Sequence, residues 1–280
     1  MVEERLRGPE AQNATELEIA SAMRNVGIDR AKLHGWPNTY VFTKAIGEML
    51  LEKLEENVKL IIVRPTIITS TYKEPFSGWT ECLRTLDSIF VAYGKGKLKF
   101  FVGDPNSTLD MIHGDMVVNS MLVAMAMHTN QPSHRLIHHI GSSLRNPLKY
   151  EDMRWLMYNY LIKNPLLDTG GKPIKVKKGK ILETTASFHR YIAIRYLPFV
   201  QMLKLVNMIL CNHFRNLHAN ARRRIDYPIR LAELFDDTTT ENLRTTIRGS
   251  EVFNFDPKCI QWDEYFMNTH FPGITKYALK

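Results

Sequence analysis

Tyr40 and Lys44 are the two residues of this sequence whose types and spacing could do chemistry together. They stand four positions apart, so on a helix their side chains share a face, about 5–6 Å from each other. A phenol is a poor acid at neutral pH, and a neighbouring ammonium group favours its phenolate form. Such a pair can exchange a proton with a carbonyl substrate. The same spacing also arises by chance, as a ring beside a solvated lysine, so the surrounding elements decide its meaning.

The flanking sequence predicts a helix followed by a buried strand. Pro37 suits the first turn of a helix. Apolar residues recur at helical spacing after it, namely Val41, Ala45, Ile46, Met49, Leu50 and Leu54. Residues 58–65 (VKLIIVRP) then form an apolar run that stops at a proline, as a buried parallel strand does. A helix and then a strand make half of a βαβ unit, which indicates an α/β fold.

Longer stretches extend this pattern into a family. Residues 35–48 (GWPNTYVFTKAIGE), 64–79 (RPTIITSTYKEPFSGW) and 93–104 (YGKGKLKFFVGD) resemble plant alcohol-forming fatty acyl-CoA reductases, members of the extended short-chain dehydrogenase/reductase superfamily. Residues 253–279 are similar to the C-terminal domain of that family. The resemblance implies the C-terminal part of a Rossmann-like doubly wound parallel sheet, followed by a mostly helical C-terminal domain. The implied domains are a partial NAD(P)-binding domain in residues 1–150 and the helical domain in residues 151–280.

The resemblance also implies an activity, the NADPH-dependent reduction of a long-chain fatty acyl-CoA to a primary fatty alcohol. In that reaction Tyr40 would protonate the oxyanion that appears as hydride reaches the carbonyl carbon. Lys44 would favour the phenolate and bond the nicotinamide ribose. Pro65, Thr66 and Ile67 would be cofactor-binding residues beside the nicotinamide, or would only shape the loop after a core strand. A nucleotide-sugar epimerase of the same superfamily is disfavoured by the acyl-reductase stretches.

The sequence departs from the family in two places. Residues 1–34 hold no Gly-x-x-Gly-x-x-Gly loop, so the front strands and the phosphate-binding loop are expected to be missing, an N-terminal truncation. Residues 231–237 (LAELFDD) lack an aromatic-rich stretch that the family carries. An inactive homologue that binds only a membrane, acyl-CoA or a partner chain is therefore the alternative function.

The missing glycine loop predicts weak or absent NADPH binding. Such a loop supplies the backbone N–H donors that hold a dinucleotide's phosphates. Isothermal titration of this chain with NADPH should therefore show little heat, and a micromolar affinity would contradict the prediction.

The net charge of +8 indicates either a partner that carries phosphates or basic residues in solvated loops. Its local concentrations are residues 172–180 (KPIKVKKGK) and Arg222–Arg224. No nucleic-acid-binding motif accompanies them, so an anionic membrane face or an acyl-CoA head group fits better than DNA or RNA. Residues 191–210 are the most apolar long segment, but Arg195 and Lys204 argue against a transmembrane span and leave an interfacial helix or a core helix.

The remaining signals set bounds on the site and its compartment. Three widely spaced cysteines favour a reducing compartment, and no metal-ligand spacing occurs, so no metal is expected. The charged N-terminus lacks a signal-peptide core. The resemblance to the family implies a location at the endoplasmic reticulum membrane or in the cytoplasm, and a plastid stays open.

Residues 109–118 (LDMIHGDMVV) predict a strand before a helix that Asp115 caps, with Met116, Met121 and Met125 in the core.

Overall fold

The computed structural model describes residues 16–53, 60–129, 135–196, 198, 201–202, 238–246 and 252–279. Residues 222–224 and 231–237 therefore lie outside the described part of the chain. The chain divides into two units, one ending at Leu60 and the other holding the chain from Ile61 on, apart from residues 133–135. Residue 150, the expected domain boundary, falls inside the second unit, and the division at that residue stays a prediction.

The first unit is a pair of helices, α2 (Glu16–Leu33) and α3 (Thr39–Lys53). The connection between them is set by Gly35, whose φ of 77° suits a residue without a side chain. Trp36 N donates to Ala31 O at 2.8 Å and Gly35 N donates to Lys32 O at 3.0 Å. These two bonds close α2 with a Schellman motif.

Helix α3 begins at Thr39, two residues after Pro37. Asn38 is its cap, since its Oδ1 accepts a hydrogen bond from Val41 N at 2.9 Å. Pro37 precedes this cap and so lies outside the helix. None of the side chains of α3 is buried, and Leu50 is 55% exposed. The apolar spacing therefore predicted the helix correctly; Val41 and Ala45 are half-buried, whereas Met49 and Leu50 are exposed.

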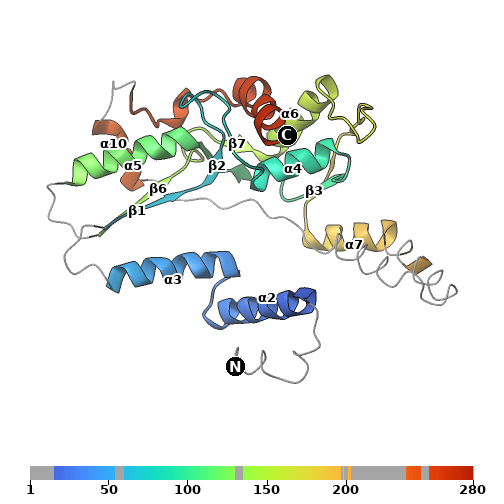
Figure 1. Ribbon diagram of the computed structural model, residues 1–280, viewed down its shortest axis with the longest axis horizontal. Helices are drawn as coiled ribbons and strands as arrows, with labels where there is room; N and C mark the ends of the chain where they lie inside the picture. Colours follow the sequence, from blue (N-terminus) through green and yellow to red (C-terminus); the bar gives the residue numbers. More distant parts are fainter. Residues whose placement is uncertain are drawn as a thin grey trace. The chain divides into compact units, whose positions relative to one another are not determined.

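The central strands of the second unit form one extended run with a break at Thr66. β1 (Leu60–Pro65) pairs with β6 (Arg135–Ile140), and β2 (Ile67–Thr69) pairs in parallel with β5 (Met111–His113). Figure 1 shows β1 continuing into β2. Thr66 N donates to Ile140 O at 3.0 Å and Ile67 N donates to Asp110 O at 3.1 Å, so the chain changes partners there. The prediction that the strand stops at its proline is confirmed, since β1 ends at Pro65, and a second strand with another partner begins at Ile67.

Two further strand pairs complete the sheet elements. β3 (Phe100–Val102) pairs in parallel with β8 (Lys180–Leu182), and β4 (Thr108–Leu109) pairs antiparallel with β7 (Leu148–Lys149). Parallel pairs with helices between them, followed by a mostly helical C-terminal part, confirm the predicted α/β fold class.

The helices of the second unit pack around these strands. They are α4 (Thr85–Gly94), α5 (Gly114–His128), α6 (Tyr150–Lys163), α7 (Thr185–Arg195) and α10 (Thr238–Thr246). The C-terminal segment, residues 257–278, adds η1 (Pro257–Cys259), α11 (Trp262–Tyr265), η2 (Phe266–His270), α12 (Phe271–Gly273) and η3 (Ile274–Ala278). In the described part of the chain, no helix is long and apolar enough to cross a bilayer.

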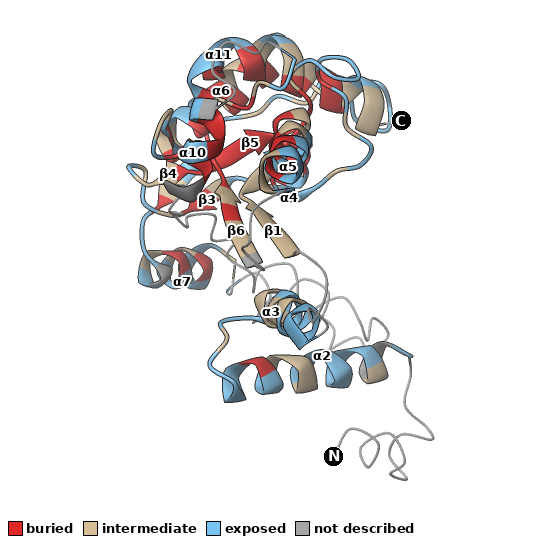
Figure 2. Ribbon diagram, turned by 90° about the vertical axis from the view of Figure 1, so that its left-hand side faces the viewer, coloured by how far each residue is buried: buried red, intermediate tan, exposed pale blue. Residues whose placement is uncertain are grey.

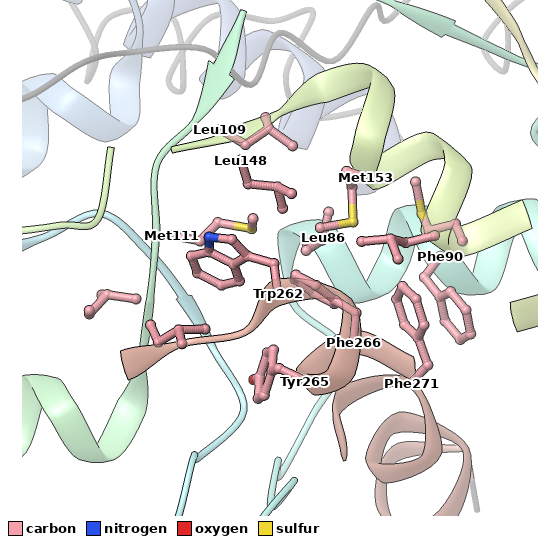
Figure 3. Close-up of a cluster of buried hydrophobic side chains, with 14 of the residues drawn as sticks. Leu86, Phe90, Leu109, Met111, Leu148, Met153, Trp262, Tyr265, Phe266 and Phe271 are labelled. Atoms are coloured by element: carbon pink, nitrogen blue, oxygen red, sulfur yellow. The ribbon is translucent and has the colours of Figure 1, made fainter. Parts of the chain in front are cut away.

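The core lies where the C-terminal segment meets α4, α6 and β5. Figure 2 shows its buried residues concentrated on these elements, whereas α2 and α3 are mostly exposed. In the close-up of Figure 3, Trp262 and Phe266 point toward Met111 and Leu86. Phe90 and Phe271 stack with ring centroids 4.4 Å apart, and both side chains are fully buried. The last described elements are therefore part of the main core and not an appendage to it.

Helix α5 departs from two expectations. Met116 is buried, but Met121 and Met125 are 46% and 61% exposed, so only the first of the three methionines packs in the core. The N-cap residue is His113, and Asp115 lies within the first turn. The strand-then-helix order predicted for this segment is confirmed. The buried face of α5 was not predictable, because apolar residues occur on several sides of this helix.

Gly273→Ala should destabilise the protein by about 1–3 kcal/mol, the usual cost of overfilling a packed site. A Cβ at Gly273 would lie 2.2 Å from Gly78 O, a backbone atom that cannot rotate away. Gly47→Ala is the matched control, because nothing lies within 4 Å of its Cβ position and alanine favours the helix by about 0.5–1 kcal/mol. Urea unfolding of both variants checks this, and equal midpoints would contradict it.

Candidate functional site

Tyr40 and Lys44 lie on one face of α3, as their spacing requires. Lys44 Nζ is 5.8 Å from the centroid of the Tyr40 ring. Tyr40 is 71% exposed, and Lys44 is exposed too. The phenol and the amine are thus exposed neighbours on this helix.

Pro65 is the last residue of β1, Thr66 joins the two strands, and Ile67 is the first residue of β2. All three are half-buried. The Thr66 Oγ1 atom is buried and makes no hydrogen bond within the described residues. An unsatisfied buried hydroxyl costs free energy unless a further partner reaches it. Thr66 is thus the one residue of these three with a polar side-chain atom still available to a ligand.

A buried polar cluster occupies the carboxyl ends of β2 and β5, where ligands bind in many parallel sheets. Thr69 and His113 end the two strands and are paired in register. Thr69 Oγ1 lies 3.0 Å from His113 Nδ1. Tyr265 OH lies 3.0 Å from Thr69 Oγ1 and 2.8 Å from Ser70 Oγ. The tyrosine comes from the C-terminal segment, so this segment closes over the carboxyl end of the sheet.

His270 completes the cluster and connects it to α4. Its Nδ1 lies 2.8 Å from Ser70 Oγ, and its Nε2 lies 3.1 Å from Asp87 Oδ1. Burial raises the pKa of Tyr265 far above its ordinary value, against the lowering effect of the Ser70 and Thr69 hydrogen bonds. The tyrosine is therefore a neutral hydrogen-bond donor. Because these side chains are buried, the cluster holds the C-terminal segment in place and offers no open face to a substrate.

Asp115 fixes the loop that follows β2. Its two carboxylate oxygens accept hydrogen bonds from Tyr72 N at 2.9 Å, Lys73 N at 2.7 Å and Glu74 N at 3.1 Å. These bonds are charge-assisted and lie at the positive end of α5, so each is stronger than a neutral pair. The aspartate thus positions the loop of the neighbouring strand, in addition to its place in the first helical turn.

Asp110 forms a second buried cluster beside Thr66. Its Oδ1 accepts from Ser142 N at 2.8 Å and Ser143 N at 3.2 Å, and its Oδ2 accepts from Ser143 Oγ at 2.6 Å. Gly141 permits this approach, since a Cβ there would lie 2.6 Å from Asp110 Oδ1 and 2.9 Å from Thr66 Cγ2. The Asp110 carboxylate therefore holds the residues after β6, Gly141 to Ser143, close to Thr66, which lies between β1 and β2.

A groove of about 440 Å³ lies between α6 and the C-terminal segment. Its polar lining includes Asn146, Asp152, Asn159, Gln261 and Asp263, and two indole rings, Trp155 and Trp262, contribute to its walls. None of the predicted catalytic or cofactor-binding residues lines it. Within the described residues no group of three or more His, Cys, Asp or Glu side chains is placed to hold a metal ion.

Neither of the two buried clusters was predicted from the sequence. Ser70 and His270 are 200 positions apart, and Asp110 and Ser143 are 33 apart. Only the polar residues directly after apolar strands, Thr69 and Ser70, could have been singled out, because the carboxyl ends of parallel strands gather at one edge.

Cys82 and Cys259 are exposed free thiols.

The stability of the second unit should fall as the pH drops below about 6.5. Burial, reinforced by the neighbouring His270 and opposed by Asp115, lowers the pKa of His113 to about 3. The unfolded chain therefore binds a proton at this histidine that the folded chain refuses between these two pH values. The loss is up to about 1.4 kcal/mol per pH unit from this group.

Urea unfolding at several pH values, compared with His113→Asn, measures this effect. Above pH 6.5 the histidine is neutral in both states, so its contribution is complete and constant there. Between pH 6.5 and 4 the variant should lose stability with a shallower slope than the original chain. Parallel slopes would show that His113 is not the group responsible.

Known proteins match this chain along its whole length. A family model of NAD-binding domains, described as "Male sterility protein", matches residues 2–121. "Fatty acyl-CoA reductase 1" of Arabidopsis thaliana is 46% identical over 97% of this chain and 58% of its own length. "Probable fatty acyl-CoA reductase 4" of the same plant is 45% identical over 100% of this chain and 60% of its own length.

A reductase named for its product matches as well. "Alcohol-forming fatty acyl-CoA reductase" of Simmondsia chinensis is 39% identical over 100% of this chain and 60% of its own length. The chain thus spans about 60% of the relatives that it matches. The resemblance first noted in residues 35–48, 64–79, 93–104 and 253–279 is confirmed over the full sequence. The chain is thus similar over its whole length to plant fatty acyl-CoA reductases.

Proposed function

We propose that this chain takes part in the NADPH-dependent reduction of a long-chain fatty acyl-CoA to a primary fatty alcohol. The observation that carries the proposal is the phenol and amine of Tyr40 and Lys44, adjacent and open to solvent on one face of α3, in a chain homologous to reductases of this substrate class. The overall reaction converts one acyl-CoA, two NADPH and two protons into one alcohol, one CoA and two NADP⁺.

The role of Tyr40 is to move a proton at the reacting oxygen. In the first reduction, the thioester carbon gains a hydride and its bond to sulfur breaks, which gives an aldehyde. CoA leaves as a thiolate and takes up one of the two protons to become a thiol. In the second reduction, the Tyr40 hydroxyl donates its proton to the former carbonyl oxygen as a hydride reaches the carbon, which gives the alcohol. Lys44 Nζ stabilises the phenolate left behind until water returns a proton to it.

A bound dinucleotide would supply the hydride, and each of the two units has one residue with hydrogen-bonding capacity to spare. Lys44 is exposed, so its amine has donors to spare for a ribose hydroxyl beside its contact with Tyr40. The orphaned Thr66 Oγ1 has capacity for one more hydrogen bond. A glycine-rich loop for the pyrophosphate is absent from residues 1–34, so we expect the affinity for NADPH to be low.

The test is direct product analysis. Purified protein is incubated with palmitoyl-CoA and a saturating excess of NADPH, and the extracted lipid is analysed by gas chromatography. Hexadecanol formed in proportion to enzyme supports the proposal. Absence of both aldehyde and alcohol, with the protein folded by circular dichroism, overturns it.

A second candidate is a homologue that binds a partner chain, a membrane or acyl-CoA without catalysis. The observation that favours it is the uncovered apolar face of α3, where Met49 and Leu50 are exposed. Apolar helix faces of this kind usually pack against another surface. An inactive protein whose apparent mass in solution rises when a full-length reductase is added would support this candidate.

We also propose a peripheral membrane contact and a location at the endoplasmic reticulum membrane or in the cytoplasm beside it. A long acyl chain and its alcohol product partition into lipid, which supports a working place at a membrane surface. A plastid also stays open. Fluorescence microscopy of a tagged chain tests the location, and a signal confined to the nucleus or the cell exterior would contradict it.

A further inference from the structure

The segment from α6 to β8 carries a concentrated positive charge. Between residues 162 and 183 the chain has six lysines and two carboxylates. One carboxylate, Asp168, is occupied by its own turn, since its Oδ1 accepts from Gly170 N at 2.8 Å and from Lys172 N at 2.9 Å. Among the ion pairs of the described residues, none involves a lysine of this segment. The charge is therefore available to an external partner.

The lysines are held on a fixed surface and not on a free loop. Arg154 Nη1 donates to Gly179 O at 2.8 Å, and Tyr93 OH donates to Lys177 O at 2.8 Å. Ile174 N donates to Leu166 O at 2.8 Å, which closes the turn after α6. In Figure 1 this turn follows α6 in yellow-green. The anchors are buried side chains and backbone atoms, whereas the lysine side chains remain exposed.

Apolar side chains are interleaved with these lysines. Trp155 and Ile162 are seven positions apart on α6, so they share a helix face, and they are 43% and 54% exposed. Leu167, in the following turn, is 60% exposed. Lys178 Nζ lies 4.4 Å from the centroid of the Trp155 ring, which joins the charged and the apolar residues into one surface. We call this surface the lysine face; it consists of Trp155, Ile162, Leu167, Lys172, Lys175, Lys177, Lys178 and Lys180.

We propose that the lysine face docks on a membrane that carries anionic lipids. Lysines with exposed aliphatic and indole side chains suit a lipid surface, because the amines stay at the phosphates while the apolar groups enter the headgroup region. This inference rests on the peripheral membrane contact proposed above. It adds which surface of the protein makes that contact and which lipid charge it needs.

Nucleic acid fits this surface less well. Sequence readers of DNA and RNA use arginine forks and stacked planar rings. Arg154, which bonds to Gly179 O of this segment, is buried and also bonded to Glu151, so it is not available to phosphates. Ile162 and Leu167 have no planar face to stack on a base. The single exposed indole of Trp155 is already partly covered by Lys178.

Vesicle flotation tests the proposal without NADPH or acyl-CoA, so its outcome is independent of the reductase activity. The full chain should float with vesicles of phosphatidylcholine and phosphatidylserine, should not float with phosphatidylcholine alone, and should be released by salt. The variant K172Q/K175Q/K177Q should lower the partition coefficient by roughly 100-fold, since each lysine contributes about fivefold.

The matched control is K73Q/K258Q/K276Q, which removes three exposed lysines from other elements and leaves the same net charge. It should change the partition coefficient only a few fold. An equal loss in both variants would show that net charge acts without a specific surface, and would overturn the assignment. I162S/L167S should weaken binding but keep its salt dependence, because it removes apolar contacts alone.

Two competitors distinguish other sources of phosphate. If free CoA displaces the protein from vesicles at concentrations where inorganic phosphate does not, the lysine face is a CoA site and the proposal fails. If single-stranded RNA binds the chain more tightly than phosphatidylserine vesicles, and K172Q/K175Q/K177Q abolishes that binding, the partner is nucleic acid and the proposal also fails. Flotation that persists in the presence of both supports the membrane.

Discussion

Replacing Tyr40 by phenylalanine is expected to lower the rate of alcohol formation by about 100- to 10,000-fold, the range that a positioned general acid contributes. Only the hydroxyl is removed. The ring is 71% exposed, so the fold should be unaffected and the loss should appear in kcat rather than in stability. Lys44→Met should reduce the rate as well, because the phenolate then forms without its neighbouring cation. Gas chromatography of the alcohol product measures both effects.

Tyr277→Phe is the control for this substitution. Tyr277 also has an amine over its ring, with Lys276 Nζ 4.9 Å from the centroid. It lies in η3, which the proposed chemistry does not use, so its hydroxyl should be dispensable and the rate should stay within about twofold of the original. If Tyr40→Phe were as active as Tyr277→Phe, the proton would have to come from another group and the proposed role of Tyr40 would be wrong.

Phe90→Ala is expected to lower the free energy of unfolding by about 3–5 kcal/mol, the cost of emptying a large aromatic site in a packed core. Phe90 is fully buried and stacks on Phe271 at 4.4 Å with the rings 5° from parallel. It also meets Tyr160, with centroids 5.8 Å apart. Its removal therefore takes contacts from α4, α6 and the C-terminal segment at once. Guanidinium unfolding followed by tryptophan fluorescence measures the loss.

Phe253→Ala and a double variant make this test specific. Phe253 is 41% exposed, so its replacement should cost less than about 1 kcal/mol. Phe90→Ala and Phe271→Ala should be less than additive in combination, because each single variant already removes their shared stacking contact. Additive costs would show that the two rings do not support each other, and that the C-terminal segment is held mainly by other contacts.

Local features of the fold were predictable because their causes are local. The common face of Tyr40 and Lys44 follows from the helical period alone. The strand after α3 and its end at Pro65 follow from its β-branched run and from the proline. The strand that begins at Ile67 was not predicted, because it depends on pairing with β5, 44 positions further along the chain.

Long-range features were not predictable for the opposite reason. Nothing near Ser70 in the sequence indicates that His270 and Tyr265 bind it, because that contact depends on how the C-terminal segment crosses the sheet. The exposure of Met121 and Met125 has the same origin, since α5 is apolar on more than one side and tertiary packing selects the buried side. The role of Asp115 was half predicted, as its helix end was recognised but not the loop amides it binds.

The closure of the sheet by the C-terminal segment has a consequence for how the chain is made in the cell. Ser70 meets Tyr265 and His270 across separations of 195 and 200 residues. Until synthesis has passed Ile274, the surfaces of α4 and β5 that receive this segment remain uncovered. Contacts so distant form slowly, and exposed apolar surface during that interval promotes aggregation. We therefore expect the nascent chain to depend on chaperones, and recombinant yield to rise when a holdase is co-expressed.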